Sequence, residues 1–164
     1  MGGVAPARGS APEHVPRAST AAHGTTTVRY VVRSRFVHRR LPQTAVIPAG
    51  GGAGRPLLVF LHGRGRRGNE SNANGSFYAA LRALGPRAPD VVFPNGGDHS
   101  YFHARRSGDW ARYVLDEVIP RAVERLGADP RRVAIGGISM HSGAYWHRHY
   151  KRYLRFYADA LGAC

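Results

Sequence analysis

A serine and a histidine stand two positions apart in the segment GGISMHS, residues 136–142. Ser139 directly follows the apolar run VAIGGI, as expected where a strand turns sharply into a helix and presents a nucleophilic hydroxyl. Such a turn needs small residues two positions before and after the serine, because neighbouring backbones come close there. Gly137 meets the first requirement, whereas His141 stands at the second. We therefore expect Ser139 to be a nucleophile, and the alternative is an ordinary strand end with a surface serine.

A second segment could supply the hydrogen-bond donors that stabilise negative charge during acyl transfer. The letters HGRG, residues 62–65, follow the apolar run PLLVFL, and backbone N–H groups in such a loop can stabilise a developing oxyanion. We expect the N–H of Arg64 or Gly65 to be one donor and that of Met140 to be the other. The alternatives are a plain loop and a phosphate cradle, although no Gly-Lys-Ser/Thr follows to make a P-loop. We expect His62 to hold the loop rather than act as a base.

A third segment, a loop that follows an apolar run, carries two of the chain's histidines. The letters NGGDHSYFH, residues 95–103, follow another apolar run, so this loop can line a pocket near the serine. We expect Asn95, His99 and His62 to contact a substrate, and the alternative for each is a structural or surface role. The nine histidines include no H-E-x-x-H motif and no convincing ligand spacing, so no metal site is expected.

The elements that must position these residues follow from hydrophobic patterning. The runs PLLVFLH and VAIGG are apolar almost throughout, as in strands covered on both faces of a parallel sheet. We expect strands over residues 26–32, 34–41, 43–48, 56–62, 89–93 and 132–137, and helices over 75–85, 108–127 and 144–162. Pro120 is expected to kink or break the second helix. Strands that alternate with helices favour an α/β fold.

The composition limits the number of domains and the classes of protein to which the chain could belong. The 164 residues suit one domain, with residues 1–25 disordered because they are rich in Ala, Pro, Gly and Ser, and residues 26–164 folded. The net charge of +14 comes almost wholly from scattered arginines, which are typical of a GC-rich genome, so nucleic-acid binding is a minor alternative. The single cysteine excludes a disulfide framework within one chain. No run is long and apolar enough for a membrane helix or a signal peptide, so we expect no membrane association and a cytoplasmic location.

Three motifs then occur in order, namely HGRG at residues 62–65, DEVIP at 116–120 and DPRRVAIGGISM at 129–140. Over residues 30–140 the sequence resembles esterases of the α/β-hydrolase superfamily, the group that includes esterase D-like and polyhydroxybutyrate-depolymerase-like enzymes. The resemblance implies a truncated α/β-hydrolase fold, with a mostly parallel sheet, an antiparallel N-terminal hairpin and flanking helices. It also implies a serine carboxylic-ester hydrolase that acts on a small-molecule ester and needs no cofactor.

The tail of the chain carries its own resemblance. The letters HSGAYWHRHYKRYLRFYADAL are similar to the last segment of the same family, where a GGH loop delivers the catalytic histidine. On that match His141 is the base for Ser139, and the segment that normally separates the two is missing. The family order is serine, aspartate, histidine. Only Met140 lies between Ser139 and His141, so the acid has no counterpart and we expect little or no esterase activity.

The missing segment has a structural consequence and leaves other functions open. The strand before Ser139 should lie at an unpaired sheet edge, which favours self-association. A non-catalytic hydrolase remnant, an anion-binding module and a basic nucleic-acid-binding protein are the alternatives to an esterase.

Overall fold

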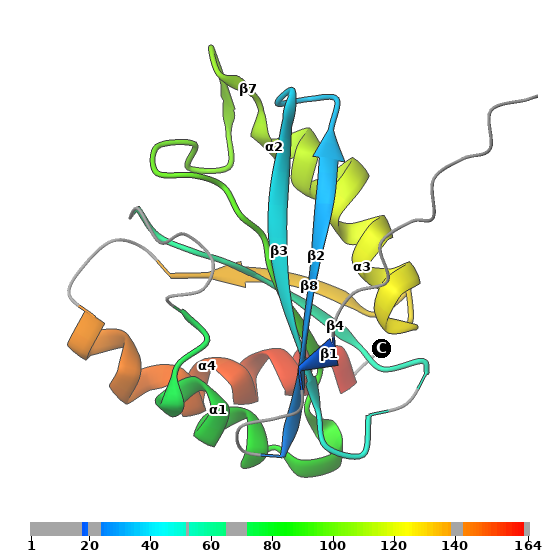
Figure 1. Ribbon diagram of the computed structural model, residues 1–164. Coiled ribbons are helices and arrows are strands. Elements are labelled where there is room, and N and C mark those ends of the chain that lie inside the picture. The colour runs from blue at the N-terminus through cyan, green and yellow to red at the C-terminus, as the bar shows by residue number, and fades with distance from the viewer. Residues whose placement is uncertain (1–17, 20–23, 52, 65–71, 139–142, 163–164) are drawn as a thin grey trace, which may run out of the picture.

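The computed structural model of the protein describes residues 18–19, 24–51, 53–64, 72–138 and 143–162 (Figure 1). Its main sheet has the strand order β1–β2–β3–β5–β4–β8. Parallel pairing joins β4 to β5 and to β8, while the pairs β1–β2, β2–β3 and β3–β5 are antiparallel. The bounds are β1 Ala18–Ser19, β2 Thr25–Ser34, β3 Arg39–Pro48, β4 Leu57–Leu61, β5 Asp90–Phe93 and β8 Val133–Gly137. The expected α/β fold with an antiparallel N-terminal hairpin is confirmed, and the sheet is mixed, with three parallel strands.

Helices cover both faces of this sheet, and a short ribbon extends one loop. The bounds are α1 Gly75–Arg82, a 3-10 turn Gly85–Arg87, α2 Trp110–Arg112, a π-helical stretch Tyr113–Val118, α3 Ile119–Leu126, α4 Gly143–Gly162, and the ribbon strands β6 Ala104–Arg105 and β7 Gly108–Asp109. The stretch from α2 to α3 is one uninterrupted helix. Pro120 therefore does not break it, and the missing N–H is accommodated beside a π-helical stretch with wider hydrogen-bond spacing.

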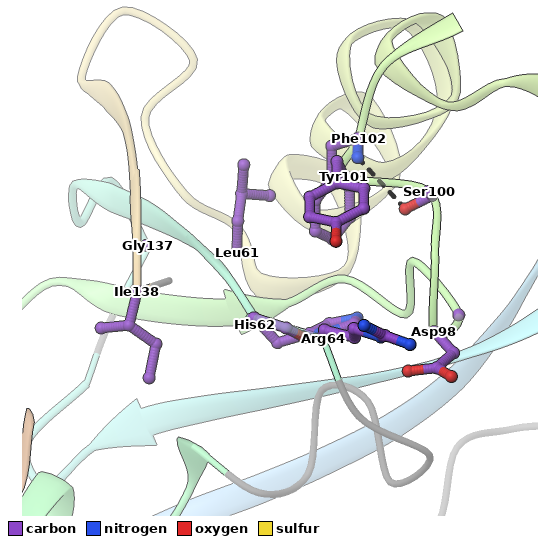
Figure 2. A pocket seen from close by; sticks show the side chains of 11 residues that line it. Leu61, His62, Arg64, Asp98, Ser100, Tyr101, Phe102, Gly137 and Ile138 are labelled. Atoms are coloured by element: carbon purple, nitrogen blue, oxygen red, sulfur yellow. Dashed lines mark hydrogen bonds between the residues drawn. The ribbon is translucent and has the colours of Figure 1, made fainter. Parts of the chain in front are cut away.

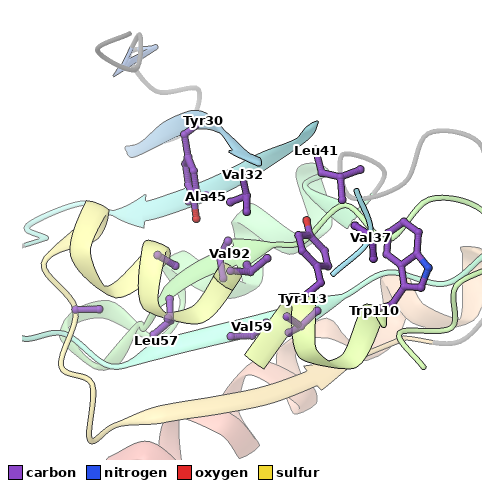
Figure 3. Close-up of a cluster of buried hydrophobic side chains, with 14 residues drawn as sticks. Tyr30, Val32, Val37, Leu41, Ala45, Leu57, Val59, Val92, Trp110 and Tyr113 are labelled. Carbon is purple, nitrogen blue, oxygen red and sulfur yellow. The ribbon is translucent and has the colours of Figure 1, made fainter. Parts of the chain in front are cut away.

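Two hydrophobic clusters pack on opposite faces of β4. Leu57 and Val59 join the side chains of the helix 110–126, including Tyr113, in one cluster (Figure 3). Leu58 and Phe60 join a second cluster with side chains of α1 and α4. Successive side chains of a strand point to opposite faces, so both clusters draw on the same five residues. The prediction that this strand is covered on both sides is confirmed.

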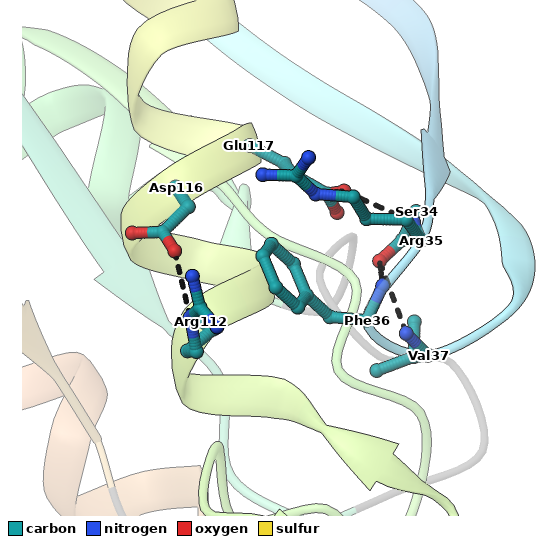
Figure 4. A network of polar contacts seen from close by, with 7 residues as sticks. All are labelled: Ser34, Arg35, Phe36, Val37, Arg112, Asp116 and Glu117. Carbon is teal, nitrogen blue, oxygen red and sulfur yellow. Dashed lines mark hydrogen bonds and ion pairs between the residues drawn. The ribbon is translucent and has the colours of Figure 1, made fainter.

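The N-terminal hairpin differs from the expected arrangement. The strands expected over residues 34–41 and 43–48 are one strand, β3, preceded by a turn at residues 35–38. His38 adopts a φ of 52°, a left-handed conformation that lets the chain reverse without a glycine. Ser34 Oγ accepts the backbone N–H groups of Phe36 and Val37, which fixes the turn (Figure 4).

The same turn is fastened to the helix 110–126 by charged side chains. The backbone N–H of Arg35 donates to Glu117 Oε1 at 3.0 Å, and the guanidinium groups of Arg35 and Arg112 lie 4.8 and 4.4 Å from the Phe36 ring centroid. Arg112 also donates to Asp116 at 2.9 Å (Figure 4). The long hairpin is thereby held against the helix at its far end.

Two other expectations need correction at the sheet edges. Within residues 1–25, expected to pack against nothing, Ala18 and Ser19 pair with β2, and β2 itself begins at Thr25. An edge strand offers unpaired backbone groups, which even a two-residue strand can satisfy. At the other end, β8 was expected to be buried, yet Ile135 is 45% exposed. The cause is that β8 is the last strand of the sheet in the described part of the chain; self-association through that edge stays a prediction.

A buried glutamine links the hairpin, the helix and the loop after β5. Gln43 Nε2 donates to Tyr113 Oη at 2.6 Å and to the Leu41 carbonyl at 2.8 Å, while its Oε1 accepts the Asn95 N–H at 3.2 Å. We expect Gln43→Met to lower the free energy of unfolding by about 1–3 kcal/mol, since buried polar groups lose their partners. Tyr113→Phe, which removes one of the three bonds, should cost less. Urea unfolding of both variants checks this, and a Gln43→Met protein as stable as the parent would contradict it.

Candidate functional site

A cavity of about 330 Å³ lies at the carboxyl ends of the three parallel strands (Figure 2). Three segments line it, one at the end of each strand: residues 61–64 at the end of β4, residues 97–98 and 100–102 after β5, and residues 137–138 at the end of β8. Its lining residues are Leu61, His62, Gly63, Arg64, Gly97, Asp98, Ser100, Tyr101, Phe102, Gly137 and Ile138. Open α/β sheets bind ligands at this edge, so the cavity is the candidate site.

The chain connections explain why the cavity is there. After β4 the chain leads to α1 on one face of the sheet, whereas after β5 it leads to the helix 110–126 on the other face. The next strand, β8, then pairs on the far side of β4. Loops that leave neighbouring strands toward opposite faces open a crevice between them.

His62 joins two of the three segments. Its Nδ1 lies 2.5 Å from the Gly63 carbonyl oxygen, and its Nε2 accepts the backbone N–H of Gly96 at 2.9 Å. This pattern requires the neutral ring with the proton on Nδ1. Burial lowers the pKa of His62, although the Gly63 carbonyl and the Asp98 carboxylate raise it in part. Both ring nitrogens are therefore engaged, in accord with a histidine that holds the loop.

The loop after β5 is built around Ser100 and Phe102. Ser100 Oγ accepts the Phe102 N–H at 3.1 Å, and the Phe102 ring meets the His62 ring edge-on with centroids 5.3 Å apart. A Cβ at Gly96 would lie 2.5 Å from the Phe102 ring, so a larger residue at that position would displace the ring. No sequence motif marks Ser100, Tyr101 or Phe102 as site residues. Their only signal is the aromatic pair within a loop that follows a buried strand.

Two residues expected to contact substrate lie beside the cavity. Asn95 Oδ1 accepts the Gly97 N–H at 3.0 Å, so its side chain shapes the loop. His99 is exposed, and its Nε2 lies 3.1 Å from Asp98 Oδ2. Neither is among the described residues that line the cavity, whereas His62 is.

The end of β8 is pressed closely against β4. A Cβ at Gly137 would lie 2.6 Å from the Leu61 carbonyl oxygen, and that same oxygen accepts the Ile138 N–H at 3.1 Å. On the α4 side, a Cβ at Gly136 would collide with the hydroxyl of Tyr157. The small residue expected two positions before Ser139 is thus required by close contact with β4.

The remaining expected site residues are only partly visible. Arg64 is exposed and lines the cavity. Gly65, Ser139, Met140 and His141 lie outside the described residues. In the described part of the chain no group of three or more His, Cys, Asp or Glu side chains could hold a metal ion, and no helix there is long and apolar enough to cross a membrane.

Comparison with known proteins identifies the fold. No protein-family model and no curated protein matches the sequence. Among solved structures, an S-formylglutathione hydrolase from Agrobacterium tumefaciens matches with a TM-score of 0.60 and 15% identity, over 74% of this chain and 52% of that chain. A ferulic acid esterase matches with a TM-score of 0.60 and 19% identity, over 79% and 57%. A bacterial heroin esterase matches at 0.51 and 20%, over 70% and 35%.

The chain therefore has the α/β-hydrolase fold, and it spans about half the length of the first two of these structures.

The state of His62 leads to a prediction about pH. Because burial holds its pKa below the ordinary 6.5, the unfolded chain binds more protons than the folded chain as pH falls through that value. We expect the free energy of unfolding of the parent to fall between pH 7.5 and 5.5 relative to that of His62→Gln. Urea unfolding of both proteins at both pH values measures this difference.

The comparison with a variant is needed because another group titrates in the same range. Burial raises the pKa of Asp90 to about 6, with Arg55 opposing, so its contribution to stability grows as pH falls. This contribution is common to the parent and His62→Gln and cancels. Parallel pH profiles in the two proteins would show that His62 is not held neutral.

Proposed function

We propose that this chain is a serine hydrolase of carboxylic esters, with Ser139 as its nucleophile. One observation carries the proposal: the cavity lies at the carboxyl ends of β4, β5 and β8, and β8 leads through Ile138 directly to Ser139. The likeness of the fold to esterase structures supports the same reaction class.

The proposed reaction is acyl transfer in two steps. Ser139 Oγ attacks the acyl carbon, its proton passes to His141, and the carbonyl oxygen becomes an oxyanion. The N–H of Met140 and that of Arg64 or Gly65 donate to this oxyanion. The alcohol leaves with the proton from His141, and water then attacks the acyl–serine ester in the same way.

Two features oppose rapid turnover by this chain. If Ser139 occupies the turn into a helix, the spacing of Ser139 and His141 disfavours a direct hydrogen bond, because residues two apart on a helix do not face each other. The order of the chain also offers no aspartate after Ser139 to orient the base, except Asp159 on α4. Asp159 forms an ion pair with Arg87, with 2.7 Å between the carboxylate oxygen and the guanidinium nitrogen.

Two of the three aspartates from Asp98 to Asp116 have partners away from the cavity. Asp109 Oδ1 accepts the Arg112 N–H at the start of the helix 110–126, and Asp116 pairs with the Arg112 guanidinium. Asp98 alone among these lines the cavity. The proposal therefore assigns this chain a reactive serine without a complete triad.

We expect hydrolysis of p-nitrophenyl acetate by the parent to exceed that by Ser139→Ala only slightly. The physical reason is that loss of the acid alone reduces the rate of a serine protease by about 10⁴. Steady-state release of p-nitrophenol from the parent, Ser139→Ala and His141→Ala measures the effect. Equal rates in the parent and Ser139→Ala would contradict the assigned nucleophile. A parent hundreds-fold faster would instead contradict the missing acid.

A further inference from the structure

Two consecutive aromatic residues at the cavity have unfavourable backbone angles. Tyr101 has a φ of 49° and Phe102 a φ of 53°. Both values lie in the left-handed region, which glycine and asparagine adopt readily and aromatic residues seldom adopt. Such conformations persist only where surrounding contacts impose them, and they concentrate at functional sites. The question is what this arrangement of the loop achieves.

Packing accounts for Phe102. Its N–H donates to Ser100 Oγ, and its ring fills the space above Gly96 against His62. The strain at Phe102 is therefore compensated by contacts that fasten the loop to the ends of β4 and β5.

Tyr101 is placed differently from Phe102. Tyr101 is 53% exposed, and among the large hydrophobic residues described only Phe156, at 66%, is more exposed. Tyr101 also lines the cavity (Figure 2). The reversal of the chain thus brings a large aromatic residue to the wall of the cavity and leaves about half of that residue exposed.

A charged neighbour restrains the ring. The Arg105 guanidinium carbon lies 5.4 Å from the centroid of the Tyr101 ring, and Arg105 Nε donates to the Ser100 carbonyl at 3.3 Å. A cation over an aromatic face is attracted by the ring's quadrupole. Arg105 therefore restrains the ring of a residue that lines the cavity.

We propose that Tyr101 is a specificity-determining residue, an aromatic platform on which a planar, conjugated group of the ester substrate stacks in the cavity. Flat π-systems stack on a restrained ring with less loss of freedom than on a mobile one, whereas a saturated ring of similar size gains only burial. The inference takes the ester from the proposed function, but the binding of a planar group does not depend on catalysis.

The test measures binding without turnover. In a Ser139→Ala background, methyl cinnamate and methyl 3-cyclohexylpropanoate are titrated against the chain by ligand-observed NMR. We expect methyl cinnamate to bind more tightly, and Tyr101→Asn to weaken its binding about three- to tenfold, the range expected for loss of one aromatic pair. Tyr101→Phe, which keeps the ring, should bind nearly as the parent does. Phe156→Asn, which removes an exposed aromatic from α4, is the matched control and should leave binding unchanged.

A stability measurement separates recognition from a purely structural role. Asparagine tolerates a positive φ, so Tyr101→Asn should unfold at the same urea concentration as the parent or a higher one. Unchanged binding of methyl cinnamate to Tyr101→Asn, equal binding of the two esters to the parent, or no binding of either would overturn the inference. Selective binding together with an unreactive Ser139 would defeat the proposed function alone.

Discussion

The hydrogen bond from the Gly96 N–H to His62 Nε2 is the contact on which the cavity depends. It joins the loop after β4 to the loop after β5, and it forms only while the imidazole is neutral. Burial of the ring favours that neutral form. Phe102 packs against the same ring, so the wall of the cavity formed by the β5 loop is fixed through His62. The third wall, at the end of β8, is fixed by close contact between Gly137 and Leu61.

In this arrangement, the residues that fix the shape of the cavity differ from those that could contact a substrate. His62 and Gln43 use their polar atoms to join segments of backbone, and Gly96 and Gly137 leave space for close neighbours. The residues that line the cavity also include Arg64, Asp98 and Tyr101. An acyl-transfer site at the end of β8 would thus meet a wall that is already ordered, which lowers the entropic cost of orienting a substrate.

The parts of the fold that sequence predicted are those in which one local signal dominates. The run at Leu57–Leu61 is apolar at every position, and it is buried on both faces. Helix α1 begins where Asn74 Oδ1 accepts the Phe77 N–H, and α3 ends at Gly127 with a φ of 66°, both recognisable from residue type. The need for a small residue at position 137 also followed from the motif, and the contact with Leu61 gives its physical cause.

The parts that sequence missed depend on tertiary contacts. The turn at residues 35–38 reverses at His38, a residue type that does not mark turns, because Ser34 and Glu117 hold it. Ala18 and Ser19 form a strand only because the edge of β2 is available. The platform at Tyr101 requires two positive φ values in non-glycine residues, which no propensity predicts.

The function proposed above requires that Ser139 be a reactive nucleophile at this cavity. The most direct measurement is labelling of the parent chain with a fluorophosphonate, followed by mapping of the adduct by mass spectrometry. Trypsin should release residues 133–148 as one peptide, which contains both Ser139 and Ser142. We expect an adduct on Ser139 that disappears in Ser139→Ala. An unlabelled parent, or an adduct on Ser142 that persists in Ser139→Ala, would contradict it.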